Sequence, residues 1–133
     1  MIAVDTSALI AILQNESEAS AFVRCLNEAD AACLSAISLQ EASMVMAGRT
    51  GDWDELDDLV RHANLEVVPH DRVLAELARE AFLRFGKGRN PARLNCGDCA
   101  SYALAKSRRI PLLFKGAAFA HTDIRPATAA PPA

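Results

Sequence analysis

Three acidic residues of the sequence lie where an expected strand or loop meets an expected helix. Asp5 directly follows the apolar, β-branched run at residues 2–4, which predicts a strand buried on both faces. Glu41 and Asp98 lie near the starts of two further expected helices. Because ligands of an open parallel sheet collect at the carboxyl ends of its strands, these acids are candidates for one shared site.

Clustered carboxylates are suited to holding a divalent cation. They repel one another and raise each other's pKa, and a bound cation removes that repulsion. Oxygen ligands favour Mg²⁺ or Mn²⁺, and such an ion beside basic residues can support hydrolysis of a phosphodiester bond. The histidines of the chain, at positions 62, 70 and 121, are scattered. This argues against a metal-free ribonuclease that uses imidazole as acid and base.

Each of the three acids also has a purely local explanation. Asp5 could be the N-cap of the helix that follows it. Glu41 lies three residues after Ser38, which is the spacing of a capping box. Asp98 lies three residues after Asn95, where an acid in the first turn compensates the helix dipole. The local and the shared explanations both stay open at this point.

An alternation of strands and helices organises the rest of the chain. Strands are expected at residues 2–4, 31–37, 65–68 and 111–114, with a short fifth candidate at the sheet edge, 122–124. Helices are expected at residues 8–13, 17–29, 38–49, 53–62, 72–85 and 95–109. Asp71 is expected to cap the fifth of these helices, and the Asp52–Glu55 spacing has capping-box form. The alternation predicts an α/β fold with a central parallel sheet of four to five strands and helices on both faces.

Length and composition fit one domain. The 133 residues are 51% hydrophobic, which is enough for a proper core, and we assign residues 1–124 to this domain. The Ala- and Pro-rich stretch 125–133 is predicted to be a disordered tail. No apolar run is long enough to span a bilayer, and the N-terminus lacks a signal-peptide pattern. The four cysteines lack framework spacing, which favours reduced thiols, so we expect a cytoplasmic protein without membrane contact.

The net charge of −3 hides an asymmetry between the two halves of the chain. Residues 1–60 carry eleven acids and two bases, whereas residues 61–133 carry six acids and twelve bases. Nine of these bases fall within residues 79–115: Arg79, Arg84, Lys87, Arg89, Arg93, Lys106, Arg108, Arg109 and Lys115. Such clustering can form a phosphate-binding face, although solvated helix faces are the simpler explanation.

Several segments together resemble one known family. They are residues 4–9 (VDTSAL), 38–43 (SLQEAS), 86–89 (GKGR), 94–99 (LNCGDC), 102–105 (YALA) and 112–116 (LLFKG), followed by Phe119 and residues 122–124 (TDI). In this order and over nearly the whole chain, they are similar to the PIN-domain ribonucleases, specifically the VapC toxins of bacterial VapBC toxin–antitoxin pairs. The resemblance implies a three-layer PIN-like fold.

The resemblance also implies an activity and partners. It implies a Mg²⁺- or Mn²⁺-dependent endoribonuclease in the bacterial cytoplasm, with RNA as its substrate. A cognate VapB-type antitoxin would neutralise it by placing its C-terminal segment in the active groove. Asp5 and Asp98 would be direct metal ligands, and Glu41 would coordinate directly or through water. Ser7 or Thr6 would orient Asp5. The family usually forms homodimers, and apolar residues of the 53–60 helix are either a protein contact or part of this protein's own core.

One departure from the family pattern concerns a further acid. The family usually carries an acid between Gly116 and Phe119, where this chain has Ala117 and Ala118. Asp123 could partly replace it, or could merely end an edge strand. The departure puts a second metal site in doubt. It also keeps open a catalytically weakened PIN domain that acts as an RNA- or protein-binding module.

Two other classes of protein share parts of the pattern. Cys96 and Cys99 form a C-x-x-C motif, which occurs in redox pairs and in halves of zinc sites, but the sequence has no second ligand pair at suitable spacing. A phosphoacceptor receiver domain shares the fold class and the strand that leads to Lys115. It would need paired acids after the first strand and an acid where Val68-Pro69 stands.

Overall fold

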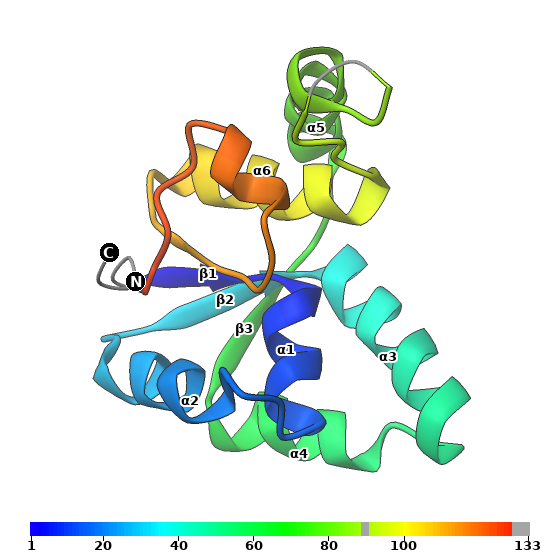
Figure 1. Ribbon diagram of the computed structural model, residues 1–133, viewed down its shortest axis with the longest axis vertical. Helices are drawn as coiled ribbons and strands as arrows, with labels where there is room; N and C mark the ends of the chain where they lie inside the picture. Colours follow the sequence, from blue (N-terminus) through cyan, green and yellow to red (C-terminus); the bar gives the residue numbers. More distant parts are fainter. Residues whose placement is uncertain (89–90, 129–133) are drawn as a thin grey trace.

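Four short strands of mostly buried, apolar residues form one parallel sheet in the computed structural model, which describes residues 1–88 and 91–128 (Figure 1). The strands are β1 (Ile2–Val4), β2 (Ala32–Ser35), β3 (Leu65–Val68) and β4 (Leu112–Leu113). Their order across the sheet is β3-β2-β1-β4, and every neighbouring pair is parallel. The two central strands, β1 and β2, therefore deliver their carboxyl ends to the same edge.

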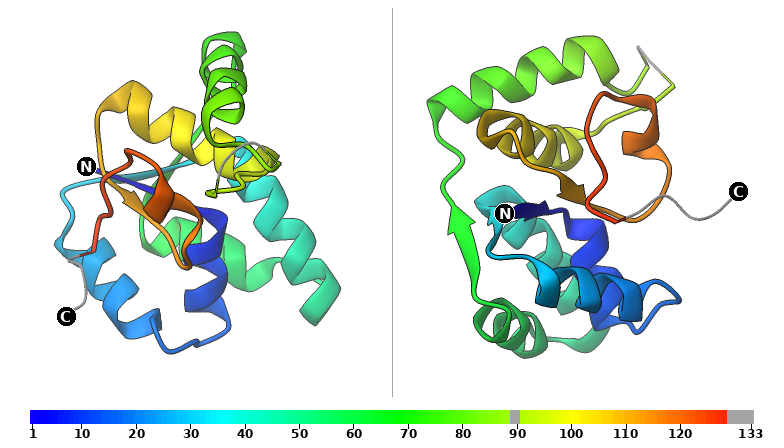
Figure 2. Two further views of the ribbon diagram at one scale, coloured as in Figure 1. Left: turned by 45° about the horizontal axis from the view of Figure 1, so that its top comes forward. Right: turned by 90° about the vertical axis from the view of Figure 1, so that its left-hand side faces the viewer.

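Helices cover both faces of this sheet. They are α1 (Thr6–Leu13), α2 (Ala19–Glu28), α3 (Ala36–Thr50), α4 (Asp54–His62), α5 (Arg72–Phe85) and α6 (Cys96–Arg108), with a short 3-10 turn η1 (Ala118–His121). Figure 2 shows α5 and α6 on one side of the sheet and α1, α2 and α4 on the other. The predicted three-layer α/β fold with a central parallel sheet is confirmed.

Two apolar clusters hold the layers together, one on each face of the sheet. Phe85, Tyr102 and Leu104 belong to the cluster under α5 and α6. Leu9 and Leu56 belong to the cluster on the opposite face, under α1 and α4. The helix α3 contacts both α1 and α6, so it joins the two sides near the carboxyl ends of the strands.

The structure corrects two helix starts. The strand expected at residues 31–37 ends at Ser35, and α3 begins at Ala36 because the Ser35 side chain accepts a hydrogen bond from the Ile37 N–H. The expected capping box at Asp52 is wrong as well. The N-cap of α4 is Trp53, which makes no side-chain capping bond, while Asp52 accepts a hydrogen bond from the Asp54 N–H.

The apolar stripe of α4 faces mainly this protein's own core. Leu56 is fully buried, and Leu59 and Val60 pack against the same cluster. Only Trp53 of the predicted stripe is largely exposed, at 51%. Of the two explanations given for this helix, packing onto the core accounts for most of its apolar residues.

The end of the described chain differs from the prediction. Residues 122–124 form no strand; instead Pro126 forms a parallel bridge with Leu112 of β4. The Leu112 N–H donates to the Arg125 carbonyl, and the Ala127 N–H donates to the Leu112 carbonyl. Residues 125–127 are therefore bound to the sheet, and the remainder of the predicted tail, 129–133, lies outside the described residues. No helix in the described ranges has the length and apolar character needed to cross a membrane.

Candidate active site

Asp5 lies at the carboxyl end of β1 and caps α1. Its extended backbone turns the chain out of the strand, and its Oδ2 accepts hydrogen bonds from the Ser7 N–H at 3.0 Å and the Ser7 hydroxyl at 2.7 Å. The side chain is almost completely buried, with only 3% of the residue exposed. The hydroxyl of the neighbouring Thr6 donates instead to the Ser38 carbonyl. Of the two residues expected to orient Asp5, Ser7 makes the contact.

A second serine holds the other oxygen of Asp5. The Ser101 Oγ lies 2.6 Å from Asp5 Oδ1, and it lies 3.1 Å from the Ser38 Oγ. Ser38 and Ser101 are both buried. The sequence prediction missed these contacts. The one available signal was spacing, because Ser101 follows Asp98 by three residues and so shares a helix face with it.

Glu41 lies in the second turn of α3, because that helix begins at Ala36. The prediction that Glu41 closes a capping box with Ser38 is therefore wrong, since Ser35 is the cap. The Glu41 carboxylate instead packs against Gly97 of α6. A Cβ atom added at Gly97 would lie 2.6 Å from Glu41 Oε2, so the glycine makes the close approach possible.

Asp98 lies in the first turn of α6, where its local explanation holds. The Asp98 N–H donates to Asn95 Oδ1 at 2.9 Å, and the Asn95 N–H donates to Asp98 Oδ2 at 3.0 Å, which completes a capping box. The pKa of Asp98 is raised to about 6, chiefly by burial and additionally by the charges of Asp5 and Glu41, against the lowering effect of the Asn95 hydrogen bond. The three predicted acids therefore come from distant segments into one electrostatic neighbourhood.

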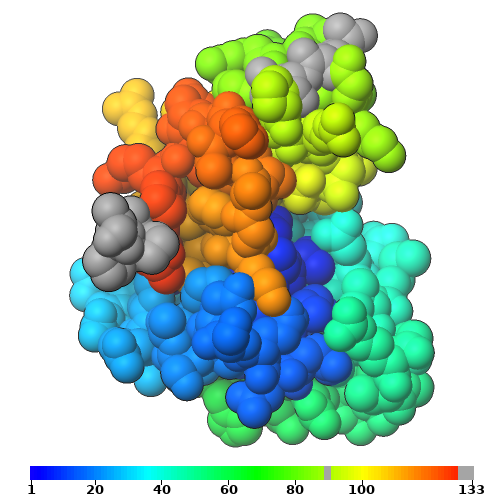
Figure 3. Space-filling view, viewed as in Figure 1, coloured from blue at the N-terminus to red at the C-terminus, as the bar shows by residue number. Residues whose placement is uncertain are grey.

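The surface view shows how these segments meet. In Figure 3 the dark-blue first residues of the chain are set back between the orange segment around residue 115, the yellow start of α6 and the cyan start of α3. The β4 side of this region is tied to α1, because the Lys115 N–H donates to the Ser7 Oγ. The Lys115 ammonium is held by Glu16 at 2.6 Å and by Glu18 at 3.5 Å.

The donor atoms of Asp5, Glu41 and Asp98 suit a hard divalent cation. All are carboxylate oxygens, and a cation would relieve the mutual repulsion that contributes to the raised pKa of Asp98. Within residues 1–88 and 91–128, however, no three His, Cys, Asp or Glu side chains are arranged as a ready group that could hold a metal ion. The three carboxylates therefore match a divalent cation in the type of donor atom, but the described residues do not form a complete set of ligands.

The basic residues of 79–115 are partly neutralised. Lys106 pairs with Asp123, Arg108 with Glu66, and Lys115 with Glu16. Lys87 and Arg93, which lie in the connection between α5 and α6, are exposed. Arg89, a predicted member of this basic loop, lies outside the described residues. The cationic surface that the structure supports is therefore smaller than the sequence predicts.

Asp123 contacts the middle of α6, and it is not among the charges that raise the pKa of Asp98. It accepts hydrogen bonds from the Tyr102 hydroxyl and from the Lys106 ammonium, which lowers its pKa although burial acts in the opposite direction. These contacts tie the segment after η1 to the middle of α6. Asp123 thus has a structural role that differs from replacing the acid absent at Ala117 and Ala118.

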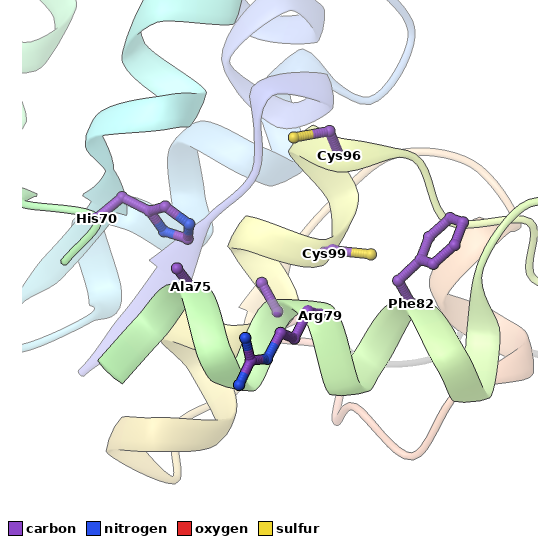
Figure 4. A pocket seen from close by; sticks show the side chains of 7 residues that line it. His70, Ala75, Arg79, Phe82, Cys96 and Cys99 are labelled. Carbon is purple, nitrogen blue, oxygen red and sulfur yellow. The ribbon is translucent and has the colours of Figure 1, made fainter. Parts of the chain in front are cut away.

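The C-x-x-C motif lines a cavity of about 350 Å³ between α5 and the start of α6. Figure 4 shows the residues around it, which are His70, Ala75, Ala78, Arg79, Phe82, Cys96 and Cys99. Cys99 is buried, and burial raises the pKa of its thiol to about 11, so the thiol stays protonated at neutral pH. All four cysteines are free. The structure gives the motif no redox or zinc role among the described residues.

Comparison with known proteins agrees with the fold. The family model described as PIN domain matches residues 2–125. Ribonuclease VapC28 of Mycobacterium tuberculosis is 46% identical over 125 residues, which cover 92% of this chain and 94% of that protein. Ribonuclease VapC of Mycolicibacterium smegmatis is 43% identical over 123 residues, which cover 91% of this chain and 95% of that protein.

Solved structures share the architecture at lower sequence identity. The crystal structure of Mycobacterium tuberculosis VapC20, described as a sarcin-ricin loop cleaving toxin, matches with a TM-score of 0.72 and 19% identity, covering 95% of this chain and all of that one. A toxin–antitoxin complex from Klebsiella pneumoniae matches with a TM-score of 0.71 and 18% identity, covering 92% of this chain and 93% of that one. The family model and the close relatives both extend over more than nine-tenths of the sequence, and the chain therefore belongs to the PIN-domain family, among the VapC ribonucleases.

Proposed function

We propose that this protein is a divalent-metal-dependent endoribonuclease that acts as the toxin of a toxin–antitoxin pair. The relatives at 40–46% identity are named as VapC ribonucleases, which supports RNA as the substrate. The observation that carries the proposal is that three acids far apart along the chain converge: Glu41 packs against Gly97, next to Asp98, and Ser101 of the same helix donates to Asp5. The charges of Asp5 and Glu41 accordingly help to raise the pKa of Asp98. Repelling carboxylates kept together are expected where a cation is to be held.

The chemistry assigns separate roles to the residues. Asp5 and Asp98 would hold Mg²⁺ or Mn²⁺ directly, and Glu41 would do so directly or through a water molecule. A bound ion of this kind supplies hydroxide near neutral pH and stabilises the charge that develops on the phosphate. Ser7 keeps Asp5 oriented through two hydrogen bonds. Lys87 and Arg93, which are exposed, would contact RNA phosphates.

The proposed partners follow from the family. A VapB-type antitoxin would neutralise the protein by occupying the groove beside the carboxylates, and the toxin–antitoxin complex among the structural neighbours supports such a partner. We also propose a homodimer in the bacterial cytoplasm. Size-exclusion chromatography with light scattering, with and without the co-expressed antitoxin, would measure both associations. A strictly monomeric toxin would contradict the dimer, and failure to co-purify would contradict the antitoxin pairing.

RNA cleavage tests the proposed activity directly. The wild-type protein is expected to cut RNA in the presence of Mg²⁺ and to lose this activity with a chelator. Asp5→Asn and Asp98→Ala are each expected to lower the rate by at least about 100-fold, because they remove proposed metal ligands. Asp58→Asn is the matched control, since Asp58 lies on α4 in an exposed pair with Arg61. Cleavage that survives in both active-site variants would refute the assignment.

A catalytically weakened module is the second candidate. It is favoured by the absence of an acid at Ala117 and Ala118 and by the lack of a ready group of three ligands in the described residues. This candidate predicts that the unmutated protein binds RNA or a protein partner but leaves RNA intact at every Mg²⁺ concentration. Mapping cut ends in cellular RNA after expression, with Asp98→Ala as the control, separates the two candidates.

A further inference from the structure

We infer that Ser101, supported by Ser38, is a positioning residue that fixes the Asp5 carboxylate for metal binding. The inference deepens the proposed function and rests on it. No motif identified in the sequence includes Ser101, which is 1% exposed and lies near the middle of α6. Among the described residues, the partners of its hydroxyl are Asp5 and Ser38.

The direction of these hydrogen bonds follows from counting protons. The Ser101 hydroxyl donates to Asp5 Oδ1 across 2.6 Å. A serine hydroxyl has one proton, and that of Ser101 is then already used. The 3.1 Å contact between the two hydroxyls must therefore have Ser38 as the donor and Ser101 as the acceptor. The result is a directed relay from Ser38 through Ser101 to Asp5.

This relay links the three segments that carry the proposed ligands. Ser38 lies on α3, three residues before Glu41, and Ser101 lies on α6, three residues after Asp98. Each helix that supplies a carboxylate also supplies one hydroxyl of the relay. The Thr6 hydroxyl adds a bond from α1 to the Ser38 carbonyl. Movement of either helix would therefore change the setting of Asp5.

The contacts of Asp5 also leave a defined position for a cation. A carboxylate offers about four acceptor positions, two on each oxygen. Ser7 fills both positions on Oδ2, with its N–H and its hydroxyl, and Ser101 fills one on Oδ1. The remaining position is on Oδ1, the oxygen that Ser101 holds. Loss of Ser101 would free that oxygen to turn, which weakens any ion bound there.

Removing each hydroxyl singly tests the relay. Ser101→Ala is expected to weaken Mg²⁺ binding by about 10–100-fold, the usual effect of losing a group that orients a metal ligand, and Ser38→Ala by a smaller factor. Ser107→Ala on α6 and Ser43→Ala on α3 are matched controls, because each of those hydroxyls donates to a backbone carbonyl of its own helix. Both controls are expected to stay within about twofold of wild type. Calorimetric titration of the RNA-free protein with MgCl₂ measures the affinity.

A double-mutant cycle distinguishes positioning from general support of the fold. If Ser101 positions Asp5, Ser101→Ala should cause no comparable further loss of Mg²⁺ affinity in an Asp5→Asn background. If Ser101 only supports the fold, its loss should lower the melting temperature equally in both backgrounds and leave the Mg²⁺ affinity unchanged. Unchanged Mg²⁺ affinity in Ser101→Ala, or no Mg²⁺ binding by the wild type, would overturn the inference.

Two outcomes separate this inference from the proposed function. If the wild type binds Mg²⁺ but cuts no RNA, the proposed function fails, and the affinities of the serine variants still decide the positioning role. If Ser101→Ala does not fold, Ser38→Ala gives the decision in the same titration, because it removes the relay donor and leaves the Ser101–Asp5 bond in place.

Discussion

Replacing Asp98 with asparagine is expected to stabilise the metal-free protein at neutral pH and to leave its stability nearly unchanged in acid. The pKa of Asp98 is raised from its ordinary 3.8 to about 6, first by burial and then by the charges of Asp5 and Glu41. Between these two pH values the folded chain retains a proton that the unfolded chain has released. The free energy of unfolding therefore falls as pH rises from about 4 to about 6, and the deficit persists above pH 6.

The magnitude follows from the difference between the two pKa values. At about 1.36 kcal/mol per pH unit, the difference between 3.8 and about 6 corresponds to at most about 3 kcal/mol. Asp98 is only half-buried, so solvent screening reduces this to about 1–2 kcal/mol. Asparagine keeps an acceptor for the Asn95 N–H but loses the favourable charge at the helix N-terminus, which costs about 0.5 kcal/mol. The expected net gain is about 1 kcal/mol, or roughly 4 °C in melting temperature.

Thermal unfolding in the presence of a chelator, at pH 4 and at pH 7.5, measures this gain. The difference in melting temperature between Asp98→Asn and wild type should be small at pH 4 and larger at pH 7.5. Asp58→Asn, on an exposed helix face, should show no such dependence on pH. Adding Mg²⁺ at pH 7.5 should stabilise the wild type more than the variant. A variant that is equally or less stable than wild type at pH 7.5 would refute the electrostatic reasoning.

Two further substitutions test individual contacts. Gly97→Ala should impair RNA cleavage but change the free energy of unfolding by less than about 1 kcal/mol, because the added Cβ meets only the movable end of Glu41, 2.6 Å away. Gly48→Ala is the control, because a Cβ added there meets open space. Equal cleavage by the two variants would contradict the role of Glu41. Asp71→Ala should destabilise the protein by about 1 kcal/mol in urea unfolding, because it removes the acceptor for the Leu74 N–H at the start of α5, and an unchanged midpoint would contradict this.

The sequence was sufficient for the elements whose signals are local. The β-branched run before Asp5, the cap at Asp71 and the Asn95–Asp98 spacing each predict a boundary that the structure confirms. The alternation of strands and helices then predicts the parallel sheet. Prediction failed where two local signals compete. Ser35 and Ser38 are both plausible caps, and the earlier one begins α3 because the buried strand has already ended there.

Other features depend on contacts between distant segments and have no local signal. The Ser38–Ser101–Asp5 relay exists only because α3 and α6 meet beside β1. The approach of Glu41 to Gly97 is likewise set by packing. Lys106, Arg108 and Lys115 form ion pairs within the protein, so these side chains are less available to bind phosphate than the sequence suggested. The carboxylates could be nominated from position, whereas the groups that hold them could not.

The pairing of residues 125–127 with β4 has a consequence for solubility. The unpaired backbone N–H and C=O groups of an edge strand can pair with a strand from another molecule, and such pairing is a common start of aggregation. Here the Arg125 carbonyl and the Ala127 N–H occupy those groups of Leu112. Trimming the protein back to residue 124, as a disordered-tail prediction would invite, uncovers them on an otherwise buried apolar strand. Intermolecular sheet growth is then the expected failure of the shortened protein, and retaining the segment through Ala127 avoids it.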